Sequence, residues 1–88
     1  MAWTIEVSSA AERQLRKLDK PAAKRLATYL QHVSADPEGP RRRGKPLTGG
    51  LRGLWRYRVG DYRVICELND ERLVVLVVRL GHRSRIYD

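Results

Sequence analysis

The sequence has a single cysteine and no long apolar segment. One thiol, Cys66, cannot form a disulfide within the chain, so a disulfide-stapled fold is excluded. No run of 18 apolar residues is present, and the first residues, MAWTIEV, do not form an apolar signal segment. We therefore expect a soluble, cytoplasmic protein that binds no membrane. A chain of 88 residues is expected to form one domain, residues 1–88, around one modest core.

Acidic residues are scarce in the middle of the chain. Residues 41–63 contain eight lysines and arginines against one acid, and so carry most of the net charge of +8. Concentrated positive charge attracts anions, chiefly phosphate, and makes their binding depend steeply on salt. The alternative is a solvated basic face that only aids solubility.

The first part of the chain predicts one strand and one helix. Apolar and polar residues alternate over residues 2–7, as in a strand with one buried face. Ser9 and Glu12 fit a capping box, and apolar residues then recur at helical spacing. We therefore predict a strand over residues 2–7 and a helix over residues 9–18.

A second helix is predicted to follow directly. Asp19 can cap it, and Pro21 falls in its first turn, where a missing N–H costs little. Asp36 precedes a proline and is pushed out of the helical region, which ends the helix. We expect the two helices to form a hairpin, and we expect residues 37–50, rich in Pro, Gly and Arg, to form a loop.

Two strands around a tight turn are predicted next. Gly60 and Asp61 suit a two-residue hairpin loop, which sets the register and places Arg58 opposite Arg63. One face of the hairpin is then apolar and suits packing against the helices: Trp55, Tyr57, Val59, Tyr62, Val64, Cys66 and Leu68. The other face carries Leu54, Arg56, Arg58, Arg63, Ile65 and Glu67.

The arginines of the second face form a candidate anion site. Like charges directly opposite each other destabilise a strand pair unless an anion lies between them. Arg56, Arg58 and Arg63 therefore predict phosphate binding. The alternative is that their aliphatic stems cover the sheet while the charged groups stay in water.

The last part of the chain predicts a central strand and a basic tail. Residues 69–71 suit a turn, and residues 73–78, LVVLVV, lack alternation, which favours a central strand covered on both faces. The order β-α-α-β-β-β predicts an α+β fold with an antiparallel sheet packed on a helical hairpin. Arg83 and Tyr87 of the tail would join the anion site if the strand ends beside the hairpin.

These motifs resemble the RelE-type toxins of the RelE/ParE toxin–antitoxin superfamily. The resemblance covers nearly the whole chain and is carried by GKPLTGGLRGLWRYRVGDYRVICEL followed by LVVLVVRLGHRSRIY. It implies a ribosome-dependent mRNA interferase, an endoribonuclease that cuts mRNA in the A site by attack of a 2′-hydroxyl on the adjacent phosphate. It implies no metal and no cofactor.

The resemblance also implies site residues. The implied catalytic set is Arg56, Arg58, Arg63, Arg83 and Tyr87. His82 lies beside the family's arginine position and not on it, and is a further candidate because it is the only imidazole near the site. Apart from the resemblance, the positive charge concentrated over residues 41–63 makes Arg41, Arg42, Arg43, Lys45 and Arg52 candidates for RNA contacts. Fixed guanidinium groups suit a phosphate that gains negative charge in the transition state. Arginine does not readily act as a base, so His82 is the candidate for proton transfer.

The partners implied are the ribosome with its mRNA, and an acidic antitoxin that would connect the toxin to DNA only indirectly. A candidate antitoxin dock is an exposed apolar stretch around Ile65, Val74, Leu76 and Val78, and the alternative is a plain sheet face with no partner. Two other functions stay open: a ParE-like poison of DNA gyrase, and an RNA-binding module without catalysis. The set of arginines and tyrosine argues against the first, and nucleotide products with new 5′-hydroxyl ends would exclude the second.

Overall fold

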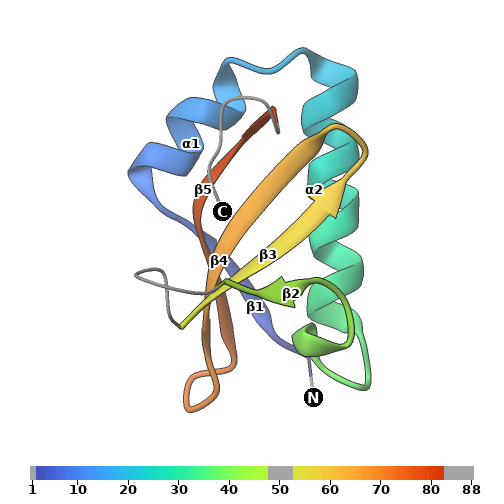
Figure 1. The fold of residues 1–88 in the computed structure, drawn as a ribbon, viewed down its shortest axis with the longest axis vertical. Coiled ribbons are helices and arrows are strands. Elements are labelled where there is room, and N and C mark those ends of the chain that lie inside the picture. The colour runs from blue at the N-terminus through green and yellow to red at the C-terminus, as the bar shows by residue number, and fades with distance from the viewer. Residues whose placement is uncertain (1, 48–52, 83–88) are drawn as a thin grey trace.

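The computed structural model describes residues 2–47 and 53–82. Five strands form one sheet in the order β1-β5-β4-β3-β2, and Figure 1 shows how the helices α1 and α2 accompany it. The strands are β1 (Thr4–Val7), β2 (Lys45–Pro46), β3 (Leu54–Val59), β4 (Tyr62–Asn69) and β5 (Val74–His82). The helices are α1 (Ser9–Arg16) and α2 (Lys20–Ala35), and a 3-10 turn spans Pro40–Arg42.

The predicted α+β class is confirmed, and the sheet differs from the prediction in two details. β1 pairs with β5 in parallel, so the sheet is mixed. The segment expected to be a loop contains the 3-10 turn and the short strand β2, which pairs with β3. The hairpin register is confirmed, because Val59 lies opposite Tyr62 and Arg58 lies opposite Arg63.

Both helices pack on one face of the sheet around a single core. The buried side chains at its centre come from both helices and from three neighbouring strands: Ala11, Leu26, Leu30, Val33, Tyr57, Val59, Val64, Cys66, Val75, Val77 and Leu80. α1 lies against β5, whereas α2 lies against β1 and β3. The apolar hairpin face predicted from the register is therefore the face that the helices cover.

α1 begins at Ser9 as predicted, but its cap lies one residue earlier than predicted. Ser8, not Ser9, is the N-cap, and its hydroxyl accepts a hydrogen bond from the Ala11 amide at 3.1 Å. The residue three positions after the cap is thus an alanine, so no capping box forms and Glu12 instead pairs with Arg16 at 2.6 Å. α2 begins after Asp19 as predicted, although the Asp19 side chain makes no capping hydrogen bond.

A β-bulge interrupts the pairing of β4 with β5. Ile65 lies opposite Arg79 and Cys66 lies opposite Val77, so Val78 has no partner on β4. The extra residue shifts the alternation of side chains by one position. Arg79 consequently lies on the face of Ile65, away from the helices, and Leu80 is in the core at 2% exposure.

Side chains of α1 complete the edge of β5 beyond the end of β1. The Ser8 hydroxyl donates to the carbonyl of Val78 at 3.2 Å, and the Gln14 side-chain carbonyl accepts from the amide of Leu80 at 2.7 Å. These contacts satisfy backbone groups that β1 is too short to reach. They fix the bulge and the end of β5 in place.

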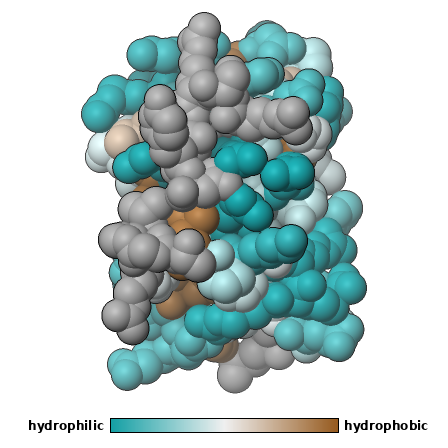
Figure 2. All heavy atoms as spheres, in the orientation of Figure 1, coloured by the Kyte–Doolittle hydropathy of each residue, from teal (hydrophilic) through white to brown (hydrophobic). Residues whose placement is uncertain are grey.

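The face opposite the helices is mostly polar, as Figure 2 shows, with a small apolar area near its middle. β5 is central as predicted, but this face of it is only partly covered, because Leu76 and Val78 are half-buried. Ile65 and Val74 are 3% and 5% exposed, so the prediction of an exposed apolar dock at these four residues is wrong. Ile65 and Val78 instead pack with Leu47 and Leu54 in a small second cluster.

Candidate functional site

The strand register brings four arginines to the sheet face that the helices leave uncovered. Arg56 and Arg58 lie on β3, and Arg63 lies on β4 directly opposite Arg58. Arg56 and Arg79 flank Ile65 from either side, since each is its direct partner on the neighbouring strand. We call Arg56, Arg58, Arg63 and Arg79 the arginine face. Three of the four were predicted, and the bulge adds Arg79.

Lys45 extends the arginine face across the next strand. It lies on β2 directly opposite Arg56, so both side chains project from the same side of the sheet. No carboxylate in residues 2–47 or 53–82 pairs with Lys45 or with Arg58. Lys45, Arg56 and Arg79 thus lie in one row across the sheet, with Ile65 of β4 between the two arginines, and Arg58 and Arg63 lie in a second row beside it.

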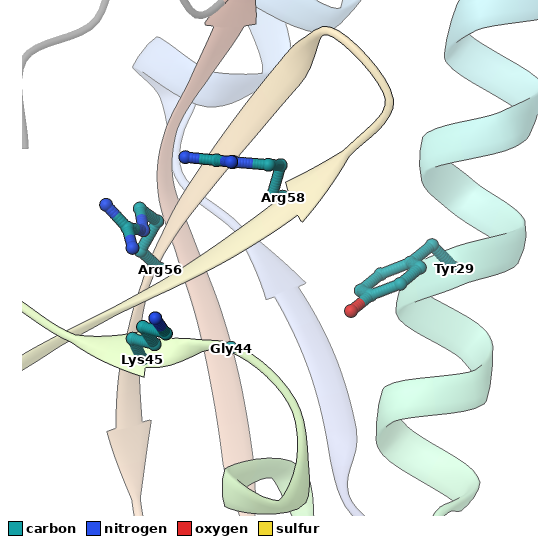
Figure 3. A pocket seen from close by; sticks show the side chains of 5 residues that line it. All are labelled: Tyr29, Gly44, Lys45, Arg56 and Arg58. Atoms are coloured by element: carbon teal, nitrogen blue, oxygen red, sulfur yellow. The ribbon is translucent and has the colours of Figure 1, made fainter.

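A pocket of about 250 Å³ lies at the edge of β3 beside β2. Its walls are Tyr29, Gly44, Lys45, Arg56 and Arg58. Figure 3 shows Tyr29 reaching from α2 toward this edge with its hydroxyl leading. By helical spacing Tyr29 lies on the same side of α2 as the buried Leu26, Leu30 and Val33, and its polar end borders the pocket.

The ring of Tyr29 is held by two neighbours. The Arg43 guanidinium carbon lies 5.6 Å from the ring centroid, and the Tyr57 ring meets Tyr29 edge-on at 6.0 Å. The Tyr57 hydroxyl itself donates to the Pro40 carbonyl at 2.7 Å and is buried. Burial is the main cause that raises the pKa of Tyr57 well above its ordinary value. Tyr57 is therefore a structural tyrosine.

Gly44 allows the chain to approach β3 closely at the pocket. Its φ is +76°, and a Cβ there would clash with the carbonyl oxygen of Arg56. The neighbouring Trp55 indole donates to the Arg43 carbonyl at 2.7 Å. Together these contacts attach the 3-10 turn and β2 to β3, which fixes the position of Lys45.

The three arginines before β2 are paired with acids. Arg41 makes two hydrogen bonds to Asp70, at 2.8 and 3.0 Å. Arg42 donates to Asp36 at 2.6 Å, and Arg43 lies 3.8 Å from the same carboxylate. These contacts neutralise part of the basic run and hold the turn, whereas Lys45 and Arg58 have no such acid partner in the described part of the chain.

Asp36 is the buried centre of this ion-pair cluster. Its side chain is 3% exposed and accepts a hydrogen bond from the Glu38 amide at 2.9 Å. This hydrogen bond and the charge of Arg42 hold the pKa of Asp36 below its ordinary value, against the opposing effect of burial. The Arg41 pair likewise lowers the pKa of Asp70.

His82 lies at the end of β5, opposite Tyr62 on β4, and the two rings meet edge-on at 5.7 Å. Directly opposed residues share a face, so His82 lies on the side of Tyr62 and not on the arginine face. The register therefore does not support the predicted role of His82 at the anion site. The other candidates Arg52, Arg83 and Tyr87 lie outside the described residues.

Among residues 2–47 and 53–82, no group of three or more His, Cys, Asp or Glu side chains is arranged to hold a metal ion. Within the same ranges no helix is long and apolar enough to cross a membrane. The one cysteine, Cys66, is fully buried, and burial raises the pKa of its thiol to about 12. The chemistry that the described site offers is therefore that of fixed cations and a tyrosine hydroxyl.

Comparison with known proteins identifies the family. Residues 5–87 match the family described as the ParE toxin of type II toxin–antitoxin system, parDE. Toxin RelG of Mycobacterium tuberculosis is 34% identical over 88 residues, which span 99% of this chain and 98% of that protein. The chain belongs to the RelE/ParE superfamily. It is a RelE-type toxin of a type II toxin–antitoxin system, as the sequence motifs predicted.

Two further matches support this placement of the RelE-type toxin. The mRNA interferase toxin RelE of Escherichia coli is 29% identical, with 97% of this chain and 87% of that protein covered. The crystal structure of the toxin–antitoxin complex RelBE2 from Mycobacterium tuberculosis contains a chain that matches with a TM-score of 0.85 at 30% identity. That match covers 94% of this chain and 100% of that one. Sequence and fold thus agree on the family.

Proposed function

We propose that this RelE-type toxin is a metal-independent endoribonuclease that cuts mRNA in the ribosomal A site and so inhibits translation in the cytoplasm. The observation that carries the proposal is the direct opposition of Arg58 and Arg63 on the open face of the sheet, with Arg56 beside them. Like charges held face to face in this way favour an anion between them. The mRNA interferase name of the Escherichia coli relative supports RNA phosphate as that anion.

The arrangement suits attack of a 2′-hydroxyl on the adjacent phosphate. As the pentacovalent phosphate forms, negative charge grows on its non-bridging oxygens, and guanidinium groups can bind these oxygens through paired hydrogen bonds. Arg58 and Arg63 approach one phosphate from two neighbouring strands, so their positions are fixed before the reaction begins. The proposal includes Arg83 and Tyr87 in the same site, on the family motif alone.

We propose an acidic antitoxin as the partner that neutralises this toxin. The related RelBE2 structure is a toxin–antitoxin complex. An acidic segment laid across the arginine face would cover Arg58 and Arg63 and block RNA at the same time, because both ligands need the same cations. DNA would then be contacted through the antitoxin.

Cleavage on the ribosome tests the proposal. Purified chain is added to programmed ribosomes with an empty A site, and mRNA ends are mapped by primer extension. We expect cuts at A-site codons for the unaltered chain and a loss of roughly a hundredfold or more for Arg63→Gln and for Arg83→Gln. Arg13→Gln, at an exposed position of α1, is the matched control and should cut normally.

The ParE description of the matching family makes gyrase poisoning the second candidate. A DNA supercoiling assay with the same preparation separates the two functions. Intact mRNA together with inhibited supercoiling would replace the endoribonuclease proposal by gyrase poisoning. Intact mRNA and unaffected supercoiling would leave RNA binding without catalysis.

A further inference from the structure

The pocket beside β2 contains two side chains that the proposed cleavage site does not use. Lys45 and Tyr29 line it together with Arg56, Arg58 and Gly44. Three of these five residues are cations, none is an acid, and the tyrosine adds a neutral hydroxyl. We propose that this pocket is a second nucleotide subsite, in which Lys45 and the Tyr29 hydroxyl bind the backbone phosphate next to the scissile one.

Charge and position favour a phosphate at Lys45. Arg58 and Arg63 are directly opposite across β3 and β4, so they converge on one phosphate. Lys45 lies on β2, on the other side of β3 from Arg63. Two strand spacings separate β2 from β4, about 9.6 Å, which is enough to place a neighbouring phosphate of the same strand. Lys45 has no ion pair among the described residues, so an arriving phosphate displaces no carboxylate.

The surroundings of Tyr29 favour its hydroxyl, not its ring, as the binding group. Arg43 covers a face of the ring and Tyr57 contacts it edge-on, which limits stacking of a base. Within the described part of the chain the Tyr29 hydroxyl makes no hydrogen bond. It points toward the edge of β3 at the pocket (Figure 3), where it can donate to a phosphate oxygen.

The size of the pocket fits part of a strand better than a whole small molecule. Small-molecule pockets usually enclose about 300–1,000 Å³, whereas this one encloses about 250 Å³. One phosphate with its sugar can occupy such a space while the rest of the strand lies along the surface. Gly44 keeps this wall of the pocket in place, since any larger residue would clash with β3 and push the neighbouring Lys45 away from it.

This inference rests on the proposed function, because it takes RNA as the ligand, and binding to an uncleavable strand tests it separately. The probe is a fluorescein-labelled hexanucleotide of 2′-O-methyladenosine, which lacks the attacking hydroxyl and stays intact. Fluorescence anisotropy gives its affinity for the full chain across a range of salt concentrations. The slope of log affinity against log salt reports the number of phosphates that cations contact.

The two variants have different expected signatures. Lys45→Gln should reduce the salt slope by about 0.7, the value for one phosphate contact on a single strand. Tyr29→Phe keeps the ring with its Arg43 and Tyr57 contacts, so it should weaken binding roughly tenfold with an unchanged slope. Lys20→Gln removes a cation at the far end of α2 and should change the affinity less than about twofold.

Each outcome decides between the proposals. If Arg58→Gln weakens binding while Lys45→Gln and Tyr29→Phe bind as the unaltered chain does, the second subsite is refuted and the cleavage proposal stands. If the chain fails to cut mRNA on ribosomes but both variants show the expected losses, the subsite stands and the cleavage proposal falls. Absence of any probe binding by the unaltered chain at low salt would overturn the subsite.

Discussion

Replacing Arg58 with glutamine should make the folded chain more stable at low salt. Arg58 lies directly opposite Arg63, and no acid among the described residues pairs with it. Two positive charges about 6 Å apart in water repel each other by about 0.7 kcal/mol, and like-charged cross-strand pairs fall in a range of about 0.2–1 kcal/mol. We therefore expect Arg58→Gln to raise the free energy of unfolding by about 0.5 kcal/mol. This gain corresponds to a Tm increase of about 2–4 °C for a domain of this size.

Thermal unfolding at two salt concentrations measures this effect. The gain should appear at 10 mM salt and vanish near 1 M, where charges are screened beyond about 3 Å. Arg79→Gln is the matched control, because Arg79 lies on the same face but directly opposite the apolar Ile65. Its salt-dependent gain should be clearly smaller than that of Arg58→Gln.

Inorganic phosphate should act on the same pair. An anion between Arg58 and Arg63 removes their repulsion, so phosphate should stabilise the unaltered chain more than it stabilises Arg58→Gln. A loss of stability in Arg58→Gln at low salt would refute the reasoning. It would mean that the Arg58 side chain contributes more through packing than it costs in repulsion.

Three further predictions concern buried groups. Tyr57→Phe should lower the free energy of unfolding by about 1–2 kcal/mol, because it leaves the buried Pro40 carbonyl unpaired. Urea unfolding followed by tryptophan fluorescence would measure this. Tyr62→Phe, which removes a hydroxyl that has no hydrogen bond to the described residues, should cost less than about 0.5 kcal/mol. Cys66 has a thiol pKa of about 12, so it should react with a disulfide reagent at pH 8 only when the chain unfolds. The labelling rate should therefore rise with urea concentration. Rapid labelling without urea would contradict the burial of Cys66. The contacts that lower the pKa of Asp36 contribute their full stabilisation above pH 3.8, the ordinary pKa of the group. This contribution to the free energy of unfolding is lost as the pH falls through the lowered pKa. In Asp36→Asn the free energy of unfolding should therefore fall less steeply as the pH is lowered. If its pH dependence at acid pH equals that of the unaltered chain, the ion pair of Asp36 with Arg42 is not coupled to folding.

The local patterns of the sequence were sufficient for most of the fold. The two-residue turn at Gly60 and Asp61 sets the register of β3 and β4, and the register decides which side chains share a face. The opposition of Arg58 and Arg63 follows from those few residues alone. The α+β class followed because the apolar sides of the two predicted helices and the four predicted strands must cover each other to be buried.

The features that the sequence missed depend on contacts between distant segments. The parallel pairing of β1 with β5 joins the two ends of the chain, and no local pattern encodes it. Tyr29 lies on the apolar side of α2 by spacing, but its hydroxyl reaches the pocket because β2 begins only at Lys45 and does not cover the edge of β3 at Arg58. The pairing of Arg42 with Asp36 depends on the 3-10 turn. A segment rich in proline and glycine predicts a loop but does not predict this turn within it.

One signal for Arg79 was present in the sequence. Strict alternation from Val75 and Val77 would place Arg79 in the core, and a buried unpaired charge is too costly for that reading. The alternation of side chains between the two faces of the strand therefore had to shift by one residue between Val77 and Leu80. The bulge at Val78 is the structural form of that change.

The bulge also determines which change of length β5 can accept. Val78 is the extra residue, so deleting it would leave a regular ladder in which Arg79 stays opposite Ile65 on the open face and Leu80 stays opposite Val64 in the core. The Leu80 amide would also stay near the Gln14 side chain, because the partner of Leu80 on β4 is unchanged. A chain shortened by this one valine should therefore still fold, with its arginine face in place. At this point of β5 the chain can lose a residue because that residue has no partner to lose.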